Sequence, residues 1–129
     1  MIFTVKIDNK EVELSNAFAW MFKYKSQFKE DPAAFLVPAF GKVAEDPTGM
    51  TAFAEIGFTR LSNMAWAMAK TANKNVPDPI TWVNSFETFN VLDFAGEIIE
   101  KAVSGMTVTN EEKADTSKNP EAVPETANP

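Results

Sequence analysis

The sequence contains no cysteine and no histidine. Without cysteine the chain has no disulfide framework and no thiolate chemistry. Without histidine it lacks the most common general base, and the two absences together remove the ligands of most zinc sites. Its five glycines are scattered, so no glycine-rich run is available to cradle a phosphate group. We therefore expect a protein that is not an enzyme, with no catalytic residue, no cofactor and no bound metal.

Long apolar runs are also missing. No apolar stretch approaches the roughly 20 residues that a membrane-spanning helix needs, and the N-terminus lacks the charged start and apolar run of a signal peptide. The net charge is −6, from 12 basic and 18 acidic residues, which argues against a nucleic-acid surface. We expect a cytoplasmic protein with no membrane partner and no nucleic-acid partner.

What the chain does contain is large aromatic side chains: eleven Phe, three Trp and one Tyr among 129 residues. Such side chains bury large areas, so a modest core can be stable. At the N-terminus, apolar residues alternate with polar ones on both sides of Asp8-Asn9, which predicts a β-hairpin. The apolar positions are Phe3, Val5, Ile7, Val12 and Leu14.

Helical spacing dominates the rest of the chain, so the predicted fold class is α+β and mostly α-helical, with a hairpin followed by about five helices. Ser15 and Asn16 are predicted to cap the first helix, and Pro38 is predicted to divide the second into two short pieces. Gly57, in the third, is expected to let another backbone approach closely. The expected helices span about 17–29, 33–44, 51–71, 79–86 and 91–104, the last capped by Asn90 and ended by Gly105.

Two side-chain groups on these helices have a structural and a functional interpretation. The aromatic stripe of the first helix, which includes Phe18 and Phe22, is interpreted as core in preference to a binding face. The carboxylates of Asp93, Glu97 and Glu100 share one face of the last helix. Paired acids can bind a cation, but these lie opposite the apolar stripe, so we interpret them as a solvated face.

The segment 61–94 holds two of the three tryptophans. Trp66 falls among polar residues on its helix, and two interpretations stay open. It packs against a second element, such as the hairpin or the helix with Pro38, or it is an exposed anchor for a partner, because Trp is enriched in binding hot spots. After the Pro77-Asp78-Pro79 break, Trp82 and Phe86 are four residues apart and are predicted to share one face.

The composition changes near residue 107. From there to the C-terminus the chain has no aromatic residue, no Leu and no Ile, and it carries five acids and two bases. A segment with so little to bury is predicted to be disordered. The expected division is a hairpin-plus-helical domain over residues 1–106 and a disordered acidic tail over residues 107–129.

The order of these segments resembles the small tail assembly chaperones of long-tailed phages and prophages of Gram-positive bacteria. The resemblance lies in a helix rich in Ala, Met and Trp, a proline break, a Trp and Phe pair and an amphipathic helix. The N-terminal FTVKIDNKEVELS also resembles the short strand pair that opens those proteins. The corresponding residues are 64–70, Val76-Pro77-Asp78-Pro79, 82–86 and 91–103.

This resemblance implies a role in tail morphogenesis: binding the tape measure protein and helping to recruit tail tube subunits. It also implies that the protein acts in the host cytoplasm and is absent from the mature virion. Trp66, Trp82 and Phe86 are the predicted contacts with a client or with a second copy of the chain. The alternatives are a structural or head–tail joining component retained in the virion, and an unrelated helical binding domain or small-molecule enzyme.

Overall fold

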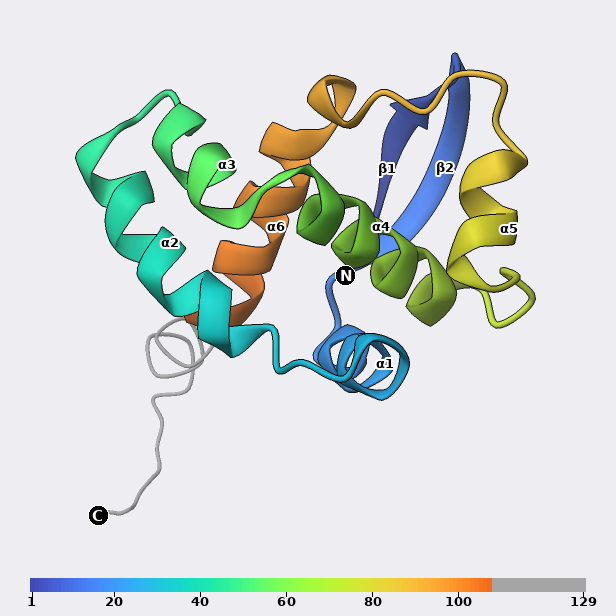
Figure 1. Ribbon diagram of the computed structural model, residues 1–129, viewed down its shortest axis with the longest axis horizontal. Helices are drawn as coiled ribbons and strands as arrows, with labels where there is room; N and C mark the ends of the chain where they lie inside the picture. Colours follow the sequence, from blue (N-terminus) through green and yellow to red (C-terminus); the bar gives the residue numbers. More distant parts are fainter. Residues whose placement is uncertain (108–129) are drawn as a thin grey trace, which may run out of the picture.

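The computed structural model describes residues 1–107 of the chain. The fold is α+β and mostly helical, as predicted, with a two-stranded hairpin followed by helices (Figure 1). The elements are β1 (Ile2–Ile7), β2 (Lys10–Ser15), α1 (Ala19–Phe28), α2 (Ala33–Glu45), α3 (Met50–Ile56), α4 (Phe58–Ala72), α5 (Pro79–Asn84), the 3₁₀ helix η1 (Val91–Asp93) and α6 (Ala95–Thr107).

The hairpin confirms the alternating pattern. Its strands are antiparallel, with Phe3 opposite Leu14 and Val5 opposite Val12. Asp8 and Asn9 have φ of 57° and 61°, a left-handed pair that matches the twist of a two-residue hairpin turn. The apolar face of the hairpin is buried, because β2 packs against α4.

Helix α4 is the centre of the core. Its buried residues occupy most of the stretch from Leu61 to Ala69, so it is surrounded on several sides. Strand β2 and α1 make its largest contacts, and α3, α5, η1 and α6 touch it as well. In Figure 1, α4 crosses the middle of the molecule, with α1 below it and α5 beside its C-terminal end.

Two predictions about helix continuity are wrong. The single helix expected over 51–71 is two helices, because Gly57 adopts φ 90° and ψ 159° and interrupts the helical backbone. A Cβ at Gly57 would meet no atom within 4 Å, so its role is conformational and no other backbone approaches it. Helix α2, by contrast, continues through Pro38. Pro38 and Ala34 are both exposed, so water can satisfy the carbonyl that loses its donor.

Helix ends also differ from expectation. Ser15 and Asn16 do not cap α1, which begins at Ala19 with no side-chain cap. Instead the Ser15 hydroxyl accepts a hydrogen bond from the Ala17 amide (3.1 Å), and the Asn16 side chain donates to the Lys101 carbonyl oxygen (2.9 Å). Asn16 is therefore used to tie the start of α1 to α6.

The last helix is interrupted near its start. Asn90 accepts from the Leu92 amide (3.2 Å) as predicted, but it caps the 3₁₀ helix η1, and Phe94 breaks the backbone before α6 begins. Helix α6 runs past Gly105 to Thr107. The predicted domain boundary at 106 therefore lies inside this helix, and the disorder predicted for the tail concerns residues outside the described part.

Candidate binding surfaces

Trp66, the first predicted contact residue, is buried with 5% of its surface exposed. Its ring meets Phe28 of α1 edge-on, with centroids 5.6 Å apart, and its indole N–H donates to the Pro77 carbonyl oxygen (2.7 Å). The packing interpretation of Trp66 is confirmed, with α1 and the loop before α5 as its neighbours. Its predicted contact with a client stays a prediction, restricted to the small exposed edge of the ring.

Trp82 and Phe86 lie together as predicted, with ring centroids 5.3 Å apart. They belong to a chain of aromatic contacts that continues through Phe89 to Phe94. Trp82 is buried (5% exposed) and Phe86 is half-buried against the core. A role for this pair in partner binding also stays a prediction, and of the two only Phe86 presents substantial surface.

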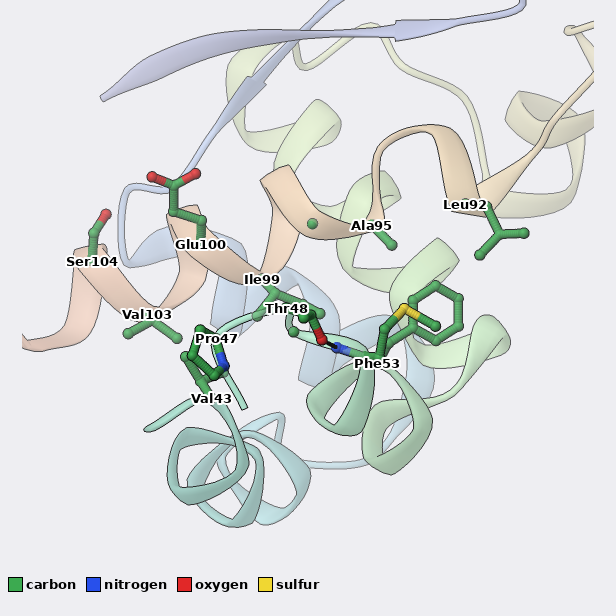
Figure 2. A pocket seen from close by; sticks show the side chains of 13 residues that line it. Val43, Pro47, Thr48, Phe53, Leu92, Ala95, Ile99, Glu100, Val103 and Ser104 are labelled. Carbon is green, nitrogen blue, oxygen red and sulfur yellow. Dashed lines mark hydrogen bonds between the residues drawn. The ribbon is translucent and has the colours of Figure 1, made fainter. Parts of the chain in front are cut away.

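A pocket with a volume of about 650 Å³ lies between α6 and the loop that joins α2 to α3 (Figure 2). We call it the α6 groove. Apolar side chains from segments about forty residues apart form its walls, and Met50 and Leu92 stand exposed at its edge. Its lining consists of Val43, Pro47, Thr48, Gly49, Met50, Phe53, Leu92, Ala95, Gly96, Ile99, Glu100, Val103 and Ser104.

The charge near the α6 groove is mainly negative. Glu100 lines the groove, and Asp93 and Glu97 precede it by seven and three residues. All three carboxylates are exposed, as predicted, but they do not share one helix face, because Asp93 lies in η1 and Glu97 and Glu100 lie in α6. The one base in this stretch, Lys101, places its ammonium 5.6 Å from the ring centre of Phe3, so its charge lies toward the hairpin.

Asp46, at the end of α2, adds a fixed negative charge beside the loop of the groove. Its carboxylate accepts hydrogen bonds from the hydroxyl groups of Thr48 and Thr51 (2.7 Å each) and from their backbone amides. These bonds stabilise the ionised form and lower the pKa of Asp46 to about 2. An occupant of the groove with apolar and basic side chains would suit this surface.

Helix α1 presents a second surface, which we call the α1 patch: Phe18, Phe22, Lys23, Lys25 and Lys29. The prediction that the whole aromatic stripe of this helix is core is wrong for Phe18 and Phe22, which are 61% and 67% exposed. Trp20, Met21 and Tyr24 fill the side that faces the molecule. The stripe was too broad for one buried face, and the sequence does not indicate which of its edges meets α4.

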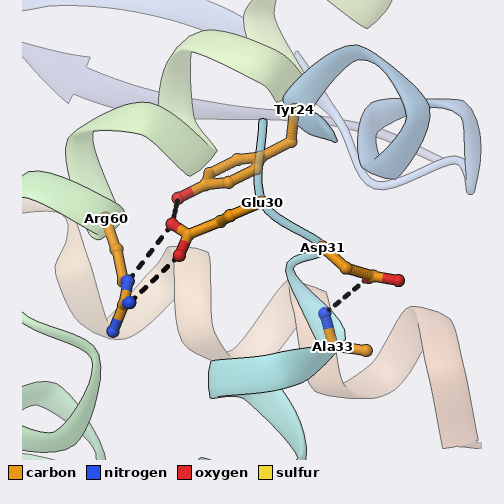
Figure 3. Close-up of polar contacts among 5 residues, drawn as sticks. All are labelled: Tyr24, Glu30, Asp31, Ala33 and Arg60. Atoms are coloured by element: carbon orange, nitrogen blue, oxygen red, sulfur yellow. Dashed lines mark hydrogen bonds and ion pairs between the residues drawn. The ribbon is translucent and has the colours of Figure 1, made fainter. Parts of the chain in front are cut away.

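A third cluster joins three elements through charge (Figure 3). Glu30, between α1 and α2, accepts hydrogen bonds from the Tyr24 hydroxyl (2.9 Å) and from Arg60 of α4 (3.0 and 3.2 Å). The Arg60 guanidinium also lies 4.9 Å from the ring centre of Phe35. Hydrogen bonding by Arg60 lowers the pKa of Glu30, while burial raises the pKa of Tyr24. A neutral phenol that donates a hydrogen bond to the carboxylate of an ion pair is suited to a structural role.

Comparison with known proteins gives no relative: no family model matches the chain, and no curated protein or solved structure is significantly similar to it. Among residues 1–107, no helix has both the length and the apolar character needed to cross a bilayer. The same residues include no group of three or more acidic side chains placed to hold a metal ion.

Proposed function

We propose that this protein is a phage tail assembly chaperone that binds the tape measure protein and helps to recruit tail tube subunits. The observation that carries the proposal is the order of segments between Met64 and Val103, which resembles the order of segments in that family. The N-terminal hairpin and the helices that follow it are compatible with the same family pattern.

The α6 groove gives the proposal a physical site. Its walls are apolar, and its volume of about 650 Å³ suits a few large side chains from one face of a helix. Helix-in-groove binding uses apolar anchors spaced three and four residues apart. The acidic residues near the groove favour an anchor helix that also carries Lys or Arg. We therefore assign the client contact to the groove in preference to the two buried tryptophans.

Binding to fragments of the tape measure protein from the same phage tests this assignment. The purified chain should bind at least one fragment, and exchanging both exposed edge residues for serine (Met50→Ser with Leu92→Ser) should weaken that binding at least tenfold, or about 1.4 kcal/mol. Ile80→Ser is the matched control, because Ile80 is equally apolar and 72% exposed but lies on α5. Its affinity should equal that of the unchanged chain.

Two results would count against the proposal. A well-folded chain that binds no fragment of the tape measure protein would contradict the function itself. A double variant that binds as tightly as the Ile80→Ser control would leave the function standing but contradict the groove as its site. Thermal unfolding of each variant checks that the substitutions have left the fold intact.

A further inference from the structure

The α1 patch combines exposed aromatic surface with positive charge. The rings of Phe18 and Phe22 meet edge-on with centroids 5.5 Å apart. Lys25 follows Phe22 by three residues in the helix, and Lys29 is the C-cap residue that ends it. No acidic residue occurs from Leu14 to Lys29. The two exposed rings form one contiguous apolar surface, and contiguous exposed apolar surface is a candidate for an interaction site.

The patch extends into a hollow of about 320 Å³ between α1 and α4. Phe22 and Trp66 supply aromatic surface to this hollow, while Lys23 and Lys70 supply basic groups. The Lys70 ammonium donates to the carbonyl oxygens of Lys74 and Val76 (2.8 and 2.6 Å), which fixes its position. The ligand that fits this surface is an acidic segment with small, rigid apolar residues.

The end of α6 lies next to the start of α1. The Asn16 side chain donates to the Lys101 carbonyl oxygen, and a Cβ added at Gly105 would lie 3.2 Å from the Asn16 side chain and backbone. Asn16 precedes Phe18 by two residues. The chain that continues beyond Thr107 therefore starts within a few residues of the α1 patch.

That continuation has the composition that the patch requires. The 22 residues from 108 to 129 carry five acids and two bases, with prolines at 120, 124 and 129. Fully extended they would reach about 70 Å, and α1, with ten residues, is only about 15 Å long. Proline-containing segments commonly bind aromatic-lined grooves, and acidic side chains beside the prolines can pair with the lysines.

We propose that the α1 patch is a binding site for the chain's own C-terminal segment, residues 108–129. Tethering places the segment at millimolar effective concentration, so weak contacts are enough to keep the site occupied. Any other protein that binds α1 must then displace the segment. This inference does not depend on the proposed function, because it uses a different surface and a different ligand.

A spin label on the segment tests the proposal in the full-length chain. Because the sequence has no cysteine, Ala122→Cys gives one unique attachment site for a nitroxide. The label should broaden the amide signals of α1 and leave those of α3 sharp. At 1 M salt, where the Debye length is about 3 Å, the broadening should fall substantially.

Charge exchange provides the matched variants. Lys25→Glu with Lys29→Glu should abolish the broadening, and adding Glu111→Lys, Glu112→Lys and Asp115→Lys to the same chain should restore it. Restored broadening would show that the Lys→Glu variant had lost charge attraction and that its helix α1 was not damaged. Lys25→Gln with Lys29→Gln is a milder test, because it removes the two positive charges without reversing them. If no α1 signal broadens in the labelled chain, the proposal is wrong.

A mixed sample identifies the source of the segment. Spin-labelled chains without ¹⁵N are added to ¹⁵N-labelled chains that carry no spin label, so only contacts between molecules can broaden a signal. The proposal expects sharp α1 signals in this mixture. If the α1 signals broaden as much in this mixture as in the sample where the observed chain itself carries the spin label, the site belongs to the tail of a second copy and the proposal is overturned.

Discussion

Glu30 is the residue where three elements meet, and its charge gives the fold a dependence on pH. Arg60 and Tyr24 both donate to its carboxylate, which lowers its pKa below the ordinary value of 4.5. A carboxyl group whose pKa is depressed in the folded state stabilises the fold above its unfolded-state pKa. This stabilisation is lost as the pH falls through the folded-state pKa.

Glu30→Gln should therefore lower the free energy of unfolding at pH 7 by about 1 kcal/mol. The value is modest because the side chains of Glu30 and Arg60 are 34% and 44% exposed, and solvent screens such pairs. At acidic pH, below the folded-state pKa of Glu30, the two chains should be equally stable, because the carboxyl group is then protonated. Urea unfolding at both pH values measures the difference.

The exposed Glu97 on α6 provides the control. Glu97→Gln should change the free energy of unfolding by less than about 0.5 kcal/mol at either pH. If Glu30→Gln behaves like this control at pH 7, the contacts of Glu30 do not contribute to stability.

Trp66 illustrates what residue-level reasoning could and could not predict. Its position among polar residues indicated a second contact surface, and the structure supplies one in Phe28 and the Pro77 carbonyl. The polar side of its helix is not solvated at this point, because α1 covers it. Local periodicity describes only one side of a helix, so it could not distinguish a second buried contact from an exposed anchor.

Gly57 is decisive at the scale of elements, because it separates α3 from α4. Its φ of 90° and ψ of 159° lie in a region essentially restricted to glycine. Gly57→Ala should therefore lower the free energy of unfolding by about 1–3 kcal/mol, although a Cβ there has room. Chemical denaturation monitored by circular dichroism measures this change.

Gly41 is the matched control, because it also has space for a Cβ but lies inside α2. Gly41→Ala should raise the free energy of unfolding by about 0.5–1 kcal/mol, since alanine favours the helix. Stabilisation by both substitutions would mean that residues 50–72 form one continuous helix in solution.

The elements that were predicted correctly are those whose own residues indicate both the type of element and where it starts or turns. The hairpin has alternation on both strands and a turn pair that tolerates positive φ, and α5 has Asp78 and Pro79 at its start. The breaks at Gly57 and Phe94 were missed because apolar spacing continues across them. The helix break predicted at Pro38 is not present, because Pro38 and Ala34, whose carbonyl loses its hydrogen-bond donor, are both exposed to solvent.

At the scale of the whole molecule, the α6 groove joins residues 43–53 with residues 92–104. No pattern in the sequence connects these segments, so the groove could not be predicted, whereas the apolar stripe of the last helix, which forms one of its walls, could. The exposure of Phe18 and Phe22 has the same origin, since the way α1 packs on α4 determines which aromatic residues stay outside. The candidate surfaces are consequences of packing between elements.

One side of the groove is held much less firmly than the other. From Phe40 to Thr51 no residue is buried, whereas Phe94, Ala95, Ile98, Ile99 and Ala102 are buried on the α6 side of the groove. Most residues between Leu61 and Ala69 of α4, outside the groove, are buried as well. Regions with few buried apolar contacts open locally at low free energy. The end of α2 and the start of α3 should therefore exchange their amide hydrogens faster than α4, and a fragment bound in the α6 groove should slow exchange at residues 42–53.

Hydrogen–deuterium exchange with and without the fragment measures both effects, with α5 as an internal reference that should not change. Protection of α5 in place of α3 would move the client site to the Trp82 and Phe86 cluster.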